Sequence, residues 1–359
     1  MSQPHKTLLI LPGGFGDGPA HRDYALGFGL KVIGASSVEN DPAAADYAEW
    51  VWLPHIADPG FEAALGELIA RRGVDQVHVT HDAILHRLQK ILPALAPQVE
   101  LTHGRTLFDL EADYRGLLAR AAKRPAILEL AAASGPKPPL SDVEVAGFVR
   151  AAMSIPGQSE EDKLMALAEV ARRAPGGDIV EIGSFMGRTA AFFSMLSGRY
   201  GLGKVLCVDP WEVEAIDQGA DALKEFAKVF DWAYWRQIFE VNVAPFAAGR
   251  LNYIHAYSVQ GAEIYSASPT ITTPTFGETR YEGRIGILYI DGNHGYDHVL
   301  ADCQAWAPHV KPGGWIVFDD YEWNWGDGVR RVGDAFLAEK GEAVRCAFVA
   351  AGALFVQLN

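Results

Sequence analysis

The feature that most limits how this chain folds is a regular alternation of short apolar runs with helical patterns. The early apolar runs are Thr7–Leu11, Leu30–Ile33, Trp50–Leu53, Gln76–Thr80 and Val99–Thr102, and the clearest helical patterns among them are Phe61–Arg72 and Asp82–Leu92. Strands that alternate with helices form a parallel sheet covered by helices. We therefore predict a small α/β domain with a parallel sheet flanked by helices for the first third of the chain.

A second series of the same kind follows in the rest of the chain. It opens with a helix after Pro156-Gly157, for which Ser159 is the expected N-cap. The strands predicted next are Asp178–Ile182, Lys204–Val208, Leu251–Ala256, Gly286–Ile290 and Gly314–Phe318. The closing runs Val344–Val349 and Ala353–Leu358, separated by Ala-Ala-Gly, predict an antiparallel hairpin. This pattern predicts a second, larger α/β sheet with a terminal hairpin.

The length of 359 residues fits two domains. The stretch SGPKPPLSD contains a glycine and three prolines that cannot continue a helix, so we place a linker at residues 134–145. The expected domains are residues 1–133 and residues 146–359.

Charge and cysteine content limit the partners and the compartment. Of the net charge of −14, the part of the chain after Pro125 carries −11. That charge argues against a nucleic acid or an anionic membrane as the partner and favours a small molecule in a cleft. The three cysteines, Cys207, Cys303 and Cys346, have no metal-binding spacing and sit in apolar runs, which is typical of reduced thiols in a cytoplasmic protein.

The segment IVEIGSFMGRTAAFF, Ile179–Phe193, joins an apolar strand to a helix through Gly183 and Gly187. Glycines let the backbone approach a ligand closely, and the helix that follows presents free N–H groups. Glu181 lies where a carboxylate can meet an ammonium group. The spacing G-x-x-x-G departs from the G-x-G-x-x-G of dinucleotide-binding proteins, so it disfavours NAD. An ordinary strand–turn–helix is the alternative.

An acidic residue, Asp209, ends the next strand 26 residues after Gly183. In nucleotide-binding α/β folds such an acid accepts hydrogen bonds from ribose hydroxyls. The alternative is an Asp that caps a helix or a turn.

Carboxylates also end the two strands that follow in the segment LYIDGNHGYDHVLADCQAWAPHVKPGGWIVFDDY. Asp291 ends one of these strands, and Asp319 and Asp320 end the other. Ligands bind at this edge of an α/β sheet, so we expect the three carboxylates to converge there. Close carboxylates repel one another unless they are protonated or bound to a cation, and oxygen ligands suit Mg²⁺, Mn²⁺ or Ca²⁺. The alternative is that Asp319 caps the next helix and Asp291 orients the substrate.

His294 follows Asp291 by three residues, on the loop at the same edge. Its imidazole titrates near neutrality and is suited to accept a proton from a hydroxyl group. A metal ligand and a packed loop histidine are the alternatives, and we expect His298 to be structural.

Taken together, these motifs make Ile179–Leu358 resemble the class I S-adenosylmethionine-dependent methyltransferases. The elements I-D-G-x-H-x-Y and P-G-G…D-D-Y are most similar to the metal-dependent O-methyltransferases of sugars, macrolides and catechol-like phenols. The resemblance implies that the cofactor is bound by residues along the strand ends: Glu181, Gly183, Ser184, Gly187, Asp209, Trp211, Tyr257, Ser258 and Asp291. It likewise implies a metal site at Asp291, Asp319 and Asp320, with His294 and Asp291 as catalytic residues.

The implied activity is methyl transfer to a hydroxyl of a small molecule, such as a sugar, polyketide or phenol, with a divalent cation. His294 or a metal-bound carboxylate would remove the hydroxyl proton. The alternatives are a non-catalytic cofactor-binding scaffold, a metal-independent N- or C-methyltransferase, and an NAD-dependent oxidoreductase that the glycine spacing disfavours.

Three further segments bear on substrate choice. The aromatic side chains of Phe226–Phe246 are expected mostly to pack in the core, with a few in a lid. Trp323 and Trp325 would form an aromatic wall over an acceptor ring. Pro269–Arg284 is polar, and we expect a mobile loop over the site.

The N-terminal domain carries GGFGDG, Gly13–Gly18, directly after its first strand. The loop is suited to cradle a phosphate, but Pro19 stands where a dinucleotide motif needs its last glycine, so a flexible turn is the alternative. Val32–Pro54 and the segment DPGFEAALGELIARRGVDQVHVTHD resemble the Rossmann-like domain that precedes ATP-grasp in carboxylate–amine ligases. Substrate binding, assembly of a homo-oligomer and recruitment of a partner are the roles expected of it.

Overall fold

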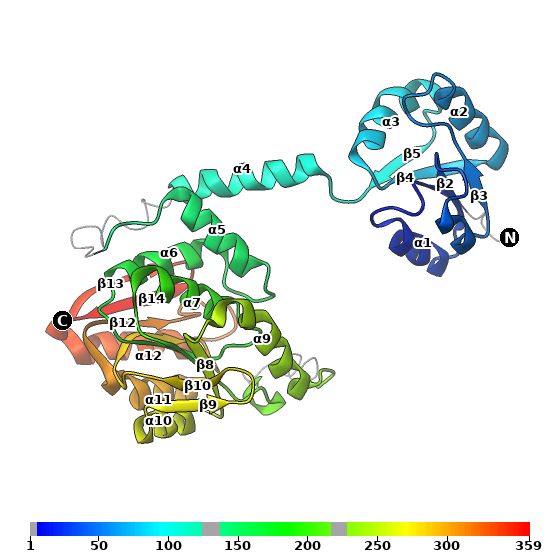
Figure 1. Cartoon of the computed structure of the whole chain (residues 1–359). Coiled ribbons are helices and arrows are strands. Elements are labelled where there is room, and N and C mark those ends of the chain that lie inside the picture. Colours follow the sequence, from blue (N-terminus) through cyan, green and yellow to red (C-terminus); the bar gives the residue numbers. More distant parts are fainter. Residues whose placement is uncertain (1–5, 124–136, 217–227) are drawn as a thin grey trace. The chain divides into compact units, whose positions relative to one another are not determined.

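The computed structural model describes residues 6–123, 137–216 and 228–359 (Figure 1). Its internal contacts divide the chain into two compact units, Met1–Gly116 and Leu117–Asn359.

The N-terminal unit is built on a five-stranded parallel sheet of order β3-β2-β1-β4-β5. Its strands are β1 (Thr7–Leu11), β2 (Lys31–Ser36), β3 (Trp50–Trp52), β4 (Val74–Val79) and β5 (Glu100–His103), and its helices are α1 (Gly18–Gly27), α2 (Phe61–Arg72), α3 (Asp82–Leu95) and the start of α4 (Leu107–Lys123). Side chains alternate between two cores, one beneath α2 and α3 and the other beneath α1. The predicted α/β arrangement is confirmed here.

The glycine-rich segment Gly13–Gly18 forms the connection from β1 to α1. The order of the sheet reverses between β1 and β4, and a cavity of about 220 Å³ lies at this point, beside Gly16, Thr80 and His103. The loop is therefore placed where α/β sheets bind ligands. Phosphate binding by this loop stays a prediction.

The C-terminal unit contains a seven-stranded sheet of order β13-β14-β12-β11-β6-β7-β8. Its strands are β6 (Asp178–Ile182), β7 (Val205–Asp209), β8 (Leu251–His255), β11 (Ile285–Ile290), β12 (Val310–Phe318), β13 (Val344–Ala350) and β14 (Ala353–Leu358). The first five are parallel to one another, whereas β14 pairs antiparallel with both β12 and β13. The predicted sheet and its terminal hairpin are both confirmed.

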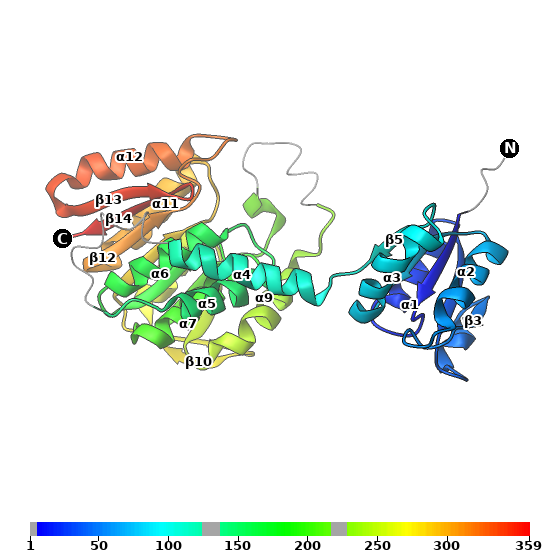
Figure 2. The same ribbon diagram turned by 90° about the horizontal axis from the view of Figure 1, so that it is seen from above.

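Helices cover both faces of this sheet (Figure 2). One core lies beneath α5 (Asp142–Met153), α6 (Glu161–Arg173), α7 (Arg188–Tyr200) and α9 (Trp232–Ala247), and the other lies beneath α10 (Ser258–Ala267), α11 (Tyr296–Trp306) and α12 (Gly328–Lys340). Strands covered on both faces read as continuous apolar runs rather than alternating ones. This explains why their bounds were predictable to within a few residues.

The order of the sheet reverses between β6 and β11, and the two strand ends approach each other closely there. Gly183, with a φ of +81°, follows β6 directly. A Cβ atom at Gly183 would lie 2.0 Å from the carbonyl oxygen of Asp291, so no other residue fits this position. The close approach places the glycine turn beside the first of the predicted carboxylates.

Three expectations about local structure are wrong: the end of the linker, the cap at Ser159 and the loop at Pro269–Arg284. The expected linker reaches too far, because Ser141 and Glu144 form a capping box that starts α5 at Asp142, while residues 124–136 lie outside the described residues. Ser159 does not cap α6, because its hydroxyl turns inward to Thr189 and Tyr289.

Pro269–Arg284 is not the expected loop over the site but contains a hairpin of β9 (Thr270–Thr273) and β10 (Gly277–Arg280). The fully buried Asn252 side chain donates hydrogen bonds to the carbonyls of Ile271 and Gly277. These bonds tie the hairpin to β8.

Within the described ranges, no helix has the length and apolar character needed to cross a bilayer. Cys207 and Cys303 are buried and Cys346 is half-buried, and all three are free thiols.

Candidate active site

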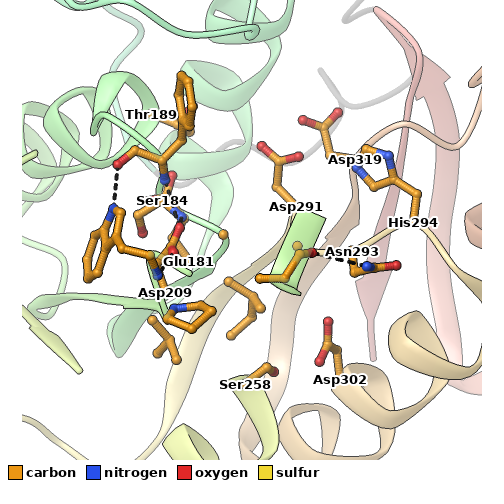
Figure 3. Close-up of a pocket in the computed structure, with 18 of the residues that line it drawn as sticks. Glu181, Ser184, Thr189, Asp209, Ser258, Asp291, Asn293, His294, Asp302 and Asp319 are labelled. Atoms are coloured by element: carbon orange, nitrogen blue, oxygen red, sulfur yellow. Dashed lines mark hydrogen bonds between the residues drawn. The ribbon is translucent and has the colours of Figure 1, made fainter. Parts of the chain in front are cut away.

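A cavity of about 430 Å³ opens at the carboxyl ends of β6, β7, β11 and β12 (Figure 3). Every residue predicted for the site contributes to its lining: Glu181, Gly183, Ser184, Gly187, Asp209, Trp211, Tyr257, Ser258, Asp291, His294, Asp319 and Asp320. Residues that are up to 139 positions apart in sequence therefore share one pocket.

Asp209 braces the glycine turn. Its carboxylate accepts hydrogen bonds from the backbone N–H groups of Ser184 and Phe185, both at 2.9 Å, and from that of Trp211 at 2.7 Å. Burial raises the pKa of this carboxyl, and the three N–H groups counter the shift. A carboxylate has about four acceptor positions, so roughly one remains for a ligand. Asp209 is thus a structural brace as well as a candidate ribose ligand.

Glu181 is 1% exposed, and its Oε2 atom has no hydrogen-bond partner among the described residues. The buried hydroxyl of Ser184, beside it, is also without a partner there. Burial raises the pKa of Glu181 to about 8. Unsatisfied buried polar atoms cost free energy, and a cationic ligand at this end of the pocket would remove that cost.

The opposite end of the pocket is formed by residues of α10 and α11. Ser258, the first residue of α10, lies near Asp302 of α11 (Figure 3). Asp302 is 6% exposed, and burial raises its pKa to about 6. Tyr257 is about half exposed and donates a hydrogen bond to Glu212. Asp302 was not predicted from sequence, because nothing in α11 marks one aspartate among its polar residues.

Asp291, His294 and Asp320 offer ligand atoms that all lie within 4.8 Å of one another. The Nε2 atom of His294 is 3.1 Å from Oδ2 of Asp320, and its Nδ1 atom is buried without a partner among the described residues. Burial lowers the pKa of His294, which keeps the imidazole neutral near pH 7. The backbone of Asp320 has a φ of +53°, a strained conformation for a residue other than glycine.

Asp319 departs from the prediction. Its carboxylate does not join this group but forms a buried ion pair with Lys163 of α6 and accepts a hydrogen bond from the hydroxyl of Tyr289. Nearby carboxylates, chiefly Asp319 and Asp291, outweigh the effect of burial and raise the pKa of Lys163, so the lysine is charged. Lys163 was not predicted from the sequence, because it lies 156 residues before its partner and belongs to no motif.

Some of the aromatic residues predicted near the site lie in the core, and others lie close to the pocket. The indole of Trp211 is 3% exposed and packs against Phe239 and Tyr253, so it is chiefly a core side chain rather than a platform for the cofactor. Trp323 lies edge-on to His294 at 4.6 Å between ring centroids, whereas Trp325 is 68% exposed. Trp323 thus lies beside a pocket residue without itself contributing to the lining, and the aromatic wall stays a prediction.

Part of the aromatic segment near α9 also reaches the pocket. Trp232 contributes to the lining and stacks at a tilt on Trp235, whereas Phe239 is fully buried. Phe226 lies outside the described residues. His298, expected to be structural, is exposed at the edge of the cavity.

One known family is similar to this region of the chain. Residues 180–321 match a family described as a methyltransferase domain. This match covers less than half of the chain and supports a methyltransferase domain within the C-terminal unit. The match runs from β6 to just past β12 and includes the glycine turn and the acidic cluster. It supports the S-adenosylmethionine-dependent class that the sequence predicts.

Other similarities are more limited. A curated relative, an uncharacterised protein of Acanthamoeba polyphaga mimivirus, is 42% identical over 69 residues, which is 19% of this chain and 30% of that protein. The match thus covers less than a third of the relative's length.

Solved structures with similar folds include the O-methyltransferase NovP, with 15% identity, a TM-score of 0.43 and coverage of 56% of this chain and 81% of that one. The O-methyltransferase TomG from Streptomyces achromogenes, in complex with SAM, has 13% identity, a TM-score of 0.38 and coverage of 69% and 99%. These scores are too low to carry an argument about activity.

Proposed function

We propose that the C-terminal unit transfers a methyl group from S-adenosylmethionine to a hydroxyl group of a small molecule. The observation that carries the proposal is the pairing of two features in one pocket. A buried carboxyl, Glu181, whose Oε2 atom has no hydrogen-bond partner among the described residues, lies beside the glycine turn, and a neutral imidazole, His294, lies within the acidic cluster. The first feature suits a cationic cofactor and the second suits removal of a proton.

The pocket offers complementary groups along the length of the cofactor. Glu181 would pair with the methionine ammonium, and the carboxylate of Asp209 has an acceptor position left for a ribose hydroxyl. Ser258 and Asp302 would face the adenine. The amino group of adenine can donate a hydrogen bond to the buried carboxylate of Asp302. Glu181 and Asp291 would then flank the part of the pocket that receives the sulfonium.

When bound, the cofactor supplies an electrophilic methyl group, and a divalent cation would lower the pKa of the acceptor hydroxyl. His294 takes the hydroxyl proton at its free Nδ1 atom while its Nε2–H faces Asp320, which fixes the ring. Trp323 against His294 limits where an acceptor ring can lie. Together these residues would orient the acceptor hydroxyl for transfer of the methyl group.

The donor set fits a hard divalent cation. Asp291 and Asp320 provide two carboxylates, and Mg²⁺ commonly uses one or two carboxylates and completes its shell with water and substrate oxygens. Burial, and next the nearby Asp319 carboxylate, raise the pKa of both carboxyls, while Lys163 opposes the shift.

Calorimetric titration with S-adenosylmethionine, and separately with Mg²⁺ and Mn²⁺, tests the proposal. We expect one cofactor per chain and one divalent cation per chain, with the cation heat abolished by Asp320→Asn. A panel of hydroxylated sugars, polyketides and phenols, analysed by mass spectrometry for an added methyl group, then identifies the acceptor class. Absence of cofactor binding to the wild-type chain would overturn the proposal and favour a scaffold.

His294 is tested by the variant His294→Ala on the acceptor found. A role as proton acceptor predicts a fall in kcat of about 10²–10⁴-fold with the Mn²⁺ affinity close to that of the wild type. Loss of Mn²⁺ binding in the same variant would instead make His294 a metal ligand.

A further inference from the structure

Lys163 places a fixed positive charge inside the acidic cluster. It lies in the first turn of α6, and its side chain is only 8% exposed, while that of its partner Asp319 is 3% exposed. A buried lysine without a partner would be strongly unfavourable, so the pair must persist in the folded protein. Lys163 also lines the same pocket as the predicted site residues.

Both oxygens of Asp319 are already engaged. Oδ1 accepts from the ammonium of Lys163 and, at 2.9 Å, from the backbone N–H of Asp320. Oδ2 accepts from the hydroxyl of Tyr289, which in turn lies 3.4 Å from the Ser159 hydroxyl. Three of the roughly four acceptor positions of this carboxylate are thus used, one of them by a charged lysine, so about one position, on Oδ2, is left for a cation.

The charges in the cluster also indicate that two of its three carboxylates bind the cation. Asp291, Asp319 and Asp320 contribute three negative charges when ionised, and Lys163 contributes one positive charge. The remaining two negative charges match one divalent cation. The distances separate the carboxylates in the same way. Asp319 is paired with Lys163, whereas Asp291 and Asp320 lie together with His294.

We propose that Lys163 is a positioning residue that withholds Asp319 from metal coordination, so that the divalent cation is held by Asp291 and Asp320 on the side of His294. The inference rests on the proposed function for the presence of a cation. It assigns to Asp319 a structural role in place of the ligand role expected from sequence.

A double-mutant cycle of Mn²⁺ affinity, measured by calorimetry and by electron paramagnetic resonance of the free ion, tests this assignment. Asp319→Asn alone leaves Lys163 unpaired beside the cation and should weaken binding about tenfold or more. Adding Lys163→Met removes that repulsion, and the double variant should return to within about threefold of the wild type. Lys163→Met alone should bind Mn²⁺ more tightly than the wild type, because a nearby positive charge is lost.

If Asp319 is a metal ligand, the double variant cannot recover, and a loss of about 100-fold that Lys163→Met does not rescue would overturn the inference. Should the double variant fail to fold, the combination of Lys163→Gln with Asp319→Asn keeps a hydrogen bond at the same place and is measured instead. Asp320→Asn is the control that should lose Mn²⁺ binding in either case.

Binding of S-adenosylmethionine is measured for every variant in parallel. A wild-type chain that binds no cofactor contradicts the proposed function. A chain that binds cofactor and Mn²⁺, but whose double variant loses Mn²⁺, contradicts only the role of Lys163.

Discussion

Glu181 links cofactor binding to pH. Its pKa of about 8 in the free protein means that the carboxyl is mostly protonated at neutral pH. Pairing with an ammonium requires the ionised form, so binding must release a proton below pH 8. The affinity for S-adenosylmethionine should therefore rise with pH, by up to about tenfold per unit between pH 6 and 7.5, where the ammonium of the cofactor is still protonated.

Calorimetry in two buffers of different ionisation enthalpy measures that proton directly. At pH 7 we expect close to one proton released per cofactor bound by the wild type and none by Glu181→Gln, whose affinity should be weaker and nearly independent of pH. An unchanged pH profile in Glu181→Gln would assign the proton to another group.

Asp209 should affect both stability and binding. Asp209→Ala leaves three backbone N–H groups without their acceptor, so we expect the free energy of unfolding to fall by about 1–3 kcal/mol and cofactor affinity to fall at least tenfold. Urea unfolding and calorimetric titration measure the two effects.

Glu212→Gln is the matched control for Asp209, because the Glu212 side chain is exposed and its carboxylate accepts a hydrogen bond from the hydroxyl of Tyr257. Its stability should remain near that of the wild type. If Glu212→Gln weakens cofactor binding and Asp209→Ala does not, the ribose ligand is Glu212.

At this scale the sequence predicts residues that belong to a motif and misses those that do not. Asp209, Asp291 and Asp320 end strands and were predictable because strand ends meet at one edge of a sheet. Lys163 and Asp302 lie within helices, where the pattern fixes the buried face but does not show which polar side chain reaches a pocket. For the same reason the sequence could not show that Asp319 is bound to a lysine.

Among the secondary-structure elements, the hairpin of β9 and β10 depends on one buried side chain. Asn252→Ala removes the amide that donates to Ile271 and Gly277 and that accepts from Thr273 at 2.7 Å. We expect faster hydrogen exchange across residues 270–280 and a loss of about 3 kcal/mol or more in stability, because several buried groups lose their partners. Hydrogen-exchange mass spectrometry measures the local effect.

Cofactor affinity of the Asn252 variant is the control. Asn252 lies near the start of β8, and the pocket lies at the carboxyl ends of the strands, so affinity should change little. A large loss of affinity would show that the hairpin supports the site after all.

The sequence predicted strands better than their connections. The strands of the C-terminal sheet are apolar on both faces, so their signal is strong, and β6 was predicted with its exact bounds. The connections depend on contacts from elsewhere in the chain. The threonines of β9 are typical of a loop in the sequence, but Thr273 donates a hydrogen bond to the buried Asn252. Ser159 is typical of a helix cap, but its hydroxyl is bound to those of Tyr289 and Thr189 instead.

For the whole molecule, the two compact units predict two separable unfolding events. Differential scanning calorimetry of the full chain should show two transitions, and S-adenosylmethionine should raise the Tm of only one of them. A ligand that binds one native unit stabilises that unit by mass action. Glu181→Gln, which weakens binding, should reduce the shift. A single transition that moves as a whole with cofactor would show that the units unfold together.

Helix α4 has a consequence for how such chains can be recombined. The contacts divide the chain at Gly116, within this helix, yet Leu117 and Ala121 from its second half are buried in the core shared with α5 and α6. In a chimaera joined at the proline-rich stretch near residue 137, the C-terminal unit would lose those two side chains. A junction just ahead of Leu107 would keep the whole of α4 with the C-terminal unit and its core. That point is therefore the better place to attach a different N-terminal domain.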